Sequence, residues 1–185
     1  MKDSKKALKL MPIIAVLTIV VYIILHEAGH CIVAAACGAR ITQFSIITAH
    51  MAYEGGSFTG SQMLWFHANG AFLPVTAAYI NMLIYPKECR NALYRIVTYV
   101  FSVMTMFSLI AWIIIPILYT FGKAPATDDC TKFLDVFTKD RSPYWVTGCA
   151  ALMITLGEAL MLAKHVFTNF KELMRTTVKD GKSQS

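Results

Sequence analysis

Four long apolar stretches decide what this chain can fold into. They cover residues 10–38, 63–85, 94–121 and 144–167, and residues 10–25 carry no charge at all. A transmembrane helix needs about 20 mostly apolar residues, so each stretch is long enough to cross a bilayer. Hydrophobic residues make up 56% of the chain, and its mean hydropathy is +0.53. The sequence therefore predicts an all-α polytopic membrane protein with about four transmembrane helices.

Residues that begin or end helices divide the first part of the chain. Pro12 suits a first helical turn and Gly38 a helix end, so we expect the first helix between them. The β-branched residues of 40–48 predict a strand. A turn at 54–57 and a short return strand at 57–60 would complete a small β-hairpin between helices one and two.

The whole chain, residues 1–185, is predicted to form one domain. A core of about 10–140 would include a long third helix that kinks or ends at Pro116. A fourth helix should cover 144–167, and the polar tail 168–185 should fray.

The positive charges predict the orientation in the membrane. The net charge is +6, and with four helices 12 of the 17 Lys and Arg residues fall on the face that holds both termini. Positive residues favour the cytoplasmic side, so we expect a multi-pass protein of the cell membrane with cytoplasmic termini. This basicity fits topology and lipid contact; no pattern favours nucleic acid as a partner. The 12 are Lys2, Lys5, Lys6, Lys9, Lys87, Arg90, Arg95, Lys164, Lys171, Arg175, Lys179 and Lys182.

The segment His26-Glu27-Ala28-Gly29-His30 ends the uncharged run. Residues four apart share one face of a helix, so His26 and His30 can bind one metal ion. In this H-E-x-x-H arrangement two histidines hold Zn²⁺ and Glu27 is the general base of a metalloprotease. At this chain's His and Glu frequencies the motif would arise by chance in roughly one such chain in 300. Ionisable groups inside a bilayer are costly and usually mark function, which strengthens the zinc prediction.

The chain resembles the site-2 protease family of intramembrane zinc metalloproteases, as a compact and divergent member. The resemblance rests on His26–His30, Gly38–Arg40, the strand residues Phe44–Ile46 and, more loosely, the small residues of Ala68–Phe72. It implies a three-helix catalytic core that hydrolyses peptide bonds in or near transmembrane segments of membrane-protein substrates.

The chain departs from that family in two ways. The resemblance implies a third ligand from an Asp-Gly pair, but the only such pair here is Asp180-Gly181, in the tail. The charge pattern also directs the motif end of the first helix outward, whereas the family keeps its site nearer the cytosol. An inverted or divergent member would account for the second difference.

We predict that Asp129 is the third zinc ligand. Catalytic zinc usually has three protein ligands and a water. Counting helices puts the loop 123–143 on the membrane face where the first helix ends, so its acids could reach His26 and His30. Asp128 would then cap the helix that follows. The alternative is that both aspartates are solvated cap residues.

Three other polar residues are candidates for the site. Glu158, in the fourth helix, could be a ligand, a substrate contact or an interhelical hydrogen-bonding group, and its depth favours the opposite membrane face. Asn69 could bind substrate or hydrogen-bond a ligand residue. His67 is more typical of a headgroup contact than of a ligand.

Two functions fit these features. The first is an intramembrane zinc endopeptidase. The second is a non-catalytic membrane scaffold or regulatory binding protein that keeps the protease fold.

Overall fold

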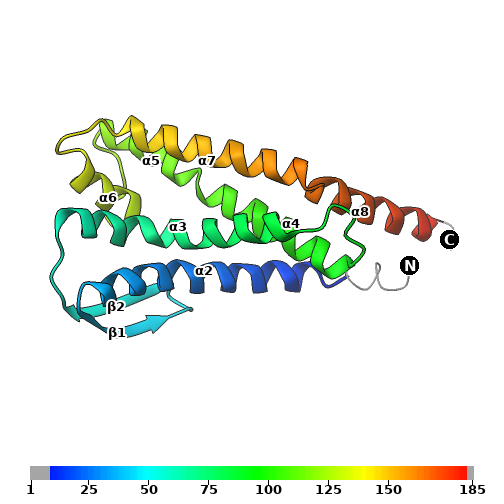
Figure 1. Ribbon diagram of the computed structural model, residues 1–185, viewed down its shortest axis with the longest axis horizontal. Coiled ribbons are helices and arrows are strands. Elements are labelled where there is room, and N and C mark those ends of the chain that lie inside the picture. Colours follow the sequence, from blue (N-terminus) through cyan, green and yellow to red (C-terminus); the bar gives the residue numbers. More distant parts are fainter. Residues whose placement is uncertain (1–8, 183–185) are drawn as a thin grey trace.

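The computed structural model describes residues 9–182, with side chains as far as Arg175. It is mostly helical, and its long helices lie lengthwise and antiparallel, so that the start of α2 and the end of α8 share one end (Figure 1). The elements are α2 (Met11–Ala36), β1 (Ala39–Ser45), β2 (His50–Gly55), α3 (Gly60–Ile84), α4 (Ala92–Ser108), α5 (Ala111–Thr120), α6 (Asp129–Phe137), α7 (Tyr144–Ala163) and α8 (Val166–Lys182). Lys2, Lys5 and Lys6, which were used to predict orientation, lie outside the described residues, as do the side chains of Lys179 and Lys182.

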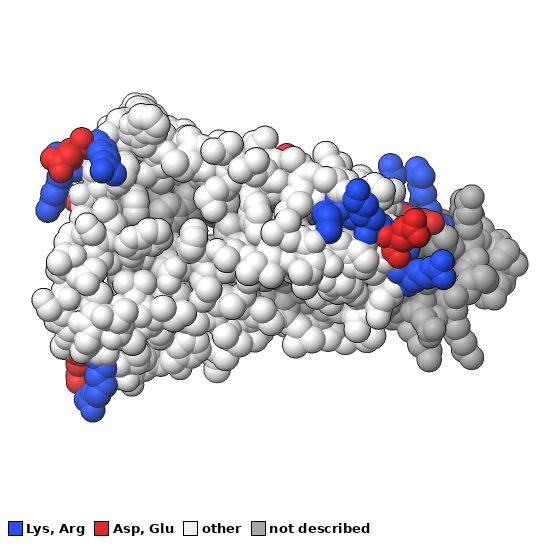
Figure 2. All heavy atoms as spheres, viewed as in Figure 1, with Lys and Arg blue, Asp and Glu red and all other residues white. Residues whose placement is uncertain are grey.

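Three helical segments among the described residues are long and apolar enough to cross a membrane. They are α2, the α4–α5 segment 92–120, and α7. The fourth predicted span, α3, has 25 residues but is more polar and is not among these three. Large apolar side chains are exposed along the three segments, among them Ile13, Leu17 and Leu152. Nearly all charged side chains on the face drawn in Figure 2 gather at its two ends, and the band between them is nearly free of charge.

The bounds of the first helix agree with the prediction to within one residue. Pro12 lies in its first turn, where the missing backbone N–H costs nothing. Gly38 follows its end with a φ of 79°, a conformation that favours glycine. The next long helix, α3, begins at a capping box, in which the side chains of Thr59 and Gln62 each accept the other's backbone N–H.

The small β-hairpin between α2 and α3 is present, but its turn was wrongly predicted. The antiparallel partner of β1 is β2 at 50–55, and not 57–60. The chain reverses at 46–49, where Ser45 Oγ accepts from the backbone N–H of Thr48 (3.2 Å) and Ala49 has a φ of 45°. Such a Ser-based turn has a weaker sequence signal than the Gly55-Gly56 pair, which ends the second strand instead.

The third long segment is interrupted earlier than Pro116 predicts. Helix α4 ends at Ser108 and α5 begins at Ala111, with tight hydrogen bonds from Leu109 N to Met106 O (3.2 Å) and from Ile110 N to Phe107 O (3.1 Å). Pro116 lies inside α5 and is buried. A proline removes one hydrogen bond and crowds the carbonyl four residues earlier, which for Pro116 is that of Trp112 inside α5. Pro116 therefore does not account for the break at 109–110.

The predictions for the fourth helix and the polar tail were wrong at their boundary. Helix α7 ends at Ala163, and His165 has a φ of 59°, so the chain breaks there and α8 follows. Val166, Phe170 and Leu173 are buried, and the last two pack with Ile14 and Ile96. Their i, i+4, i+7 spacing is the apolar stripe of an amphipathic helix, which the polar average of the tail concealed.

Candidate metal centre

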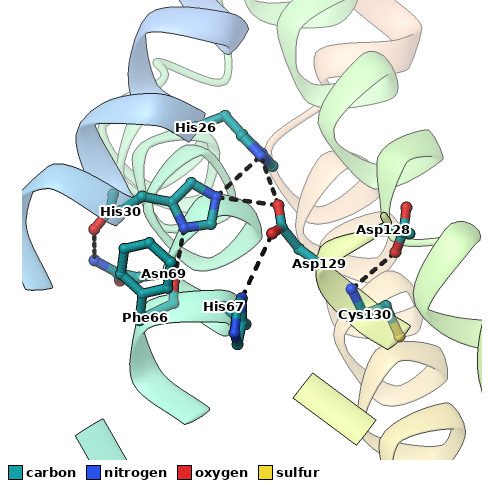
Figure 3. A network of polar contacts seen from close by, with 9 residues as sticks. His26, His30, Phe66, His67, Asn69, Asp128, Asp129 and Cys130 are labelled. Carbon is teal, nitrogen blue, oxygen red and sulfur yellow. Dashed lines mark hydrogen bonds and ion pairs between the residues drawn. The ribbon is translucent and has the colours of Figure 1, made fainter. Parts of the chain in front are cut away.

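Three side chains from two distant parts of the chain converge at the end of the molecule opposite the termini. His26 and His30 lie one turn apart on α2, and Asp129 is the first residue of α6 (Figure 3). The Nε2 atoms of the two histidines are 3.2 Å apart. Asp129 Oδ2 lies 3.2 Å from Nε2 of His26 and 3.1 Å from Nε2 of His30. Together the three residues form a group that could hold a metal ion.

The two adjacent aspartates have different environments. Asp128 is the N-cap of α6, and its carboxylate accepts the backbone N–H of Cys130 at 2.8 Å. Cys130 and Leu134 are fully buried and fix the helix against its neighbours. With the helix held in this way, Asp129 extends from its first turn toward α2 (Figure 3). Asp128 is therefore the cap of α6, and Asp129 is the aspartate that lies against the histidines.

Hydrogen bonding fixes the orientation of the His30 imidazole toward this group. Its Nδ1 lies 2.7 Å from the carbonyl oxygen of Phe66, and only an N–H can donate there, which assigns the tautomer. Nε2 of neutral His30 then has no proton, yet it lies 3.1 Å from a carboxylate oxygen of Asp129. Two acceptors so close repel each other unless Nε2 is protonated or a cation lies between them. The arrangement therefore fits a metal cation, and the backbone bond orients the imidazole as ligand histidines usually are.

The spacing of the three donor atoms fits zinc. Zn–N and Zn–O bonds of about 2.0–2.1 Å in a tetrahedron place the ligand atoms about 3.3 Å apart. The three separations here are 3.1, 3.2 and 3.2 Å. Two imidazoles and one carboxylate leave the fourth tetrahedral position for a water or substrate, as in catalytic rather than structural zinc sites.

Asp129 also faces a third histidine. Its second oxygen, Oδ1, lies 3.6 Å from Nδ1 of His67, which is on α3. Burial would raise the pKa of the Asp129 carboxyl, but its contacts with His26, His30 and His67 outweigh burial and hold that pKa below its usual range. Asp129 is therefore a carboxylate, the form that binds a metal ion.

Glu27 lies in the wall of the same cavity. This cavity has a volume of about 520 Å³, and its walls come from α2, the hairpin, α3 and α6. Glu27 is only 4% exposed, whereas the side chains of His26 and Asp129 are 25% and 26% exposed. Four of the chain's five histidines line this cavity: His26, His30, His50 and His67.

Two glycines allow α2 and α3 to approach closely at the site. A Cβ atom on Gly29 would lie 2.7 Å from the carbonyl carbon of Asn69, and one on Gly70 would lie 2.8 and 2.9 Å from two ring atoms of His26. The Gly70 position meets Nε2 of His30 more closely still. Gly70 thus lies directly against both imidazoles, and its lack of a side chain is what leaves room for them.

The remaining predicted site residues lie elsewhere. Asn69 donates from Nδ2 to the carbonyl oxygen of Gly29 at 2.7 Å, so it joins α3 to α2 and does not line the metal cavity. Glu158 is exposed and lines a different cavity, beside Tyr99 and Met161. The structure does not bring Glu158 to the metal centre.

His67 lies at the site, although the sequence favours a headgroup contact for it. The sequence feature that indicates its position is the spacing from Gly70, since residues three apart share a helix face. If Gly70 packs against the histidines of α2, His67 must face the same cavity. His67 Nδ1 is buried and makes no hydrogen bond within the described part of the chain, which fits a group oriented toward Asp129 at longer range.

No protein-family model, curated protein or solved structure matches this chain. The resemblance to the site-2 protease family therefore stays a prediction from the motif.

Proposed function

We propose that this chain is an intramembrane zinc endopeptidase that hydrolyses peptide bonds in or near transmembrane segments of membrane proteins. The observation that carries the proposal is the convergence of His26, His30 and Asp129 beside the buried Glu27, at the end of an apolar helix. A zinc ion bound there would lower the pKa of a water to about 7 and polarise the substrate carbonyl.

Each residue of the group has a defined part in this chemistry. His26, His30 and Asp129 would hold the ion. Glu27 takes the proton of the attacking water and then gives it to the leaving amine, the two steps of general base and general acid catalysis. Glu27 lies next to His26 in the chain and lines the same cavity, which supports this role.

The number of membrane crossings decides on which side of the membrane the metal centre lies. We propose that α3 is a fourth crossing, because it lies beside α2 along the same axis (Figure 1) and its Asn69 and Asn81 bond to neighbouring helices. Four crossings place both termini on one side, which the positive residues assign to the cytoplasm. The metal centre is then at the outer end of the helices.

The hairpin is proposed to hold the substrate at the site. Met51 and Tyr53 of β2 line the metal cavity, so the small sheet forms one of its walls. A peptide bond in a helix must unwind before water can attack it, and an extended segment can pair with an exposed strand by β-addition.

Reconstituted protein tests this proposal. Wild-type protein should cleave a reporter with one transmembrane segment, lose the activity to a zinc chelator and regain it with added zinc. Zinc binding without cleavage of such reporters would instead support the non-catalytic scaffold. Absence of zinc binding would exclude both a zinc enzyme and a zinc scaffold.

A further inference from the structure

A second cavity, wholly apolar, lies between α3, α5, α6 and α7. Its volume is about 210 Å³, and its walls are aromatic, aliphatic and small side chains without any charge, Trp112 and Ala150 among them. Apolar cavities do not hold water. Left empty, such a cavity forfeits dispersion contacts along its walls. Its chemistry suits a hydrocarbon chain.

This apolar cavity adjoins a cavity of about 660 Å³ that has a charged rim. The two share Ala68, Phe133 and Phe137 in their walls, and the second also has Lys139 and Arg141. Asp140 lies between these two cations, so the rim is positive overall. Arg141 lies over the ring of Phe137, 5.4 Å from its centroid. Neither Lys139 nor Arg141 forms a salt bridge with the residues that the structure describes.

Exposed aromatic residues place the rim at the level of lipid headgroups. Trp65, Tyr144 and Trp145 are 56%, 55% and 68% exposed. Trp and Tyr concentrate where a bilayer meets water, because their rings are apolar and one end is polar. The apolar cavity extends from this level along α7 toward Met153.

We propose that these joined cavities bind an anionic phospholipid. One acyl chain occupies the apolar cavity, and the phosphate lies at Lys139 and Arg141. The opposite charges of phosphate and rim, and the match of hydrocarbon to an uncharged cavity, define this ligand. The lipid site stands without the metal centre and would remain if the chain bound no zinc.

Helix α6 connects the lipid site to the metal centre, and this coupling rests on the proposed metal centre. Helix α6 carries Asp129 at its start, and Phe133 and Phe137 lie about one and two turns further along. An acyl chain packed against these rings supports the helix that presents Asp129. Bound lipid should therefore tighten zinc binding.

Tryptophan fluorescence tests the lipid site, because all three tryptophans line the joined cavities. In the double variant Trp65→Phe/Trp145→Phe, Trp112 is the only reporter. Phosphatidylglycerol with brominated acyl chains, added to the full chain in detergent, should quench Trp112 saturably and about tenfold more tightly than brominated phosphatidylcholine. Equal quenching by the two lipids would overturn the proposal.

Three further variants locate the ligand. Ala150→Leu fills the apolar cavity and should abolish saturable quenching, whereas Ala151→Leu, on the exposed side of α7, should retain it. The exposed pair Lys139→Gln/Arg141→Gln should lose the preference for phosphatidylglycerol without loss of folding. Unchanged affinity in Ala150→Leu, or an unchanged preference in the rim variant, would contradict the site.

Quenching by brominated oleic acid as tight as by phosphatidylglycerol would overturn the assignment to a phospholipid. Zinc titration of the same samples separates the proposals, since lipid binding without zinc binding would refute only the metal centre.

Discussion

Asp129 Oδ2 lies 3.1 Å from Nε2 of His30, although 99 positions separate the two residues. The contact forms only when α6 docks against α3 and α5 while α3 is paired with α2. Helix α6 has nine residues, too few to be stable alone, so its packing and its contacts with the histidines hold it in place. The metal centre and the fold at this end of the molecule therefore depend on each other.

The two adjacent aspartates should respond differently to substitution. Asp129→Ala removes a ligand, so we expect loss of zinc affinity and activity. Asp128→Ala removes only the cap of α6, and we expect a loss of about 1 kcal/mol of stability with zinc still bound. Zinc titration and thermal unfolding of both variants make the comparison. The reverse pattern would move the ligand to Asp128, and full zinc occupancy in the double variant would exclude both.

Gly70→Ala should impair the metal centre although alanine favours a helix. The added methyl group overlaps Nε2 of His30 and approaches the ring of His26, so the imidazoles must move. We expect at least a tenfold loss of zinc affinity, about 1.4 kcal/mol. The matched control is Gly148→Ala on α7, where a Cβ atom meets nothing within 4 Å. Equal zinc affinity in both variants would show that Gly70 does not set the histidine positions.

His67 should position Asp129 without binding the metal ion. Its Nδ1 faces the carboxylate oxygen directed away from His26 and His30. Loss of such a partner typically lowers metal affinity 10–100-fold, so we expect this of His67→Ala, with partial recovery in His67→Gln, which can still donate. His50→Ala, at an exposed position in the same cavity, is the control. Complete loss of zinc in His67→Ala would make His67 a ligand.

The topology can be tested with single cysteines in a background without native ones. Glu54→Cys, on the hairpin, should react with a membrane-impermeant thiol reagent added to intact cells. Lys87→Cys, at the end that holds both termini, should react only after the cells are permeabilised. The opposite result would invert the proposed orientation, and labelling of both in intact cells would argue against an odd number of crossings between them.

The sequence predicted the parts of this structure that have local signals. The i, i+4 spacing of His26 and His30 predicts that they share one face, because helix geometry alone places them together. The cap at Asp128 has an equally local signal. Asp129 was predicted as a ligand because counting the crossings puts its loop on the membrane face where the first helix ends. The cap of the following helix was assigned to its neighbour, Asp128. The turn at 46–49 and the break at His165 were missed, since each depends on non-glycine residues at positive φ that composition does not reveal. His67 was undervalued because its role depends on how α3 packs against α2.

The most direct test of the central claim compares wild type with Glu27→Gln in the same reconstituted membranes. Zinc content and cleavage of a transmembrane reporter are measured on each sample. Glu27 is not a ligand, so the variant should bind zinc like wild type and lose at least about a hundredfold in cleavage rate, as expected for removal of a general base. Cleavage by the variant at the wild-type rate would contradict the account.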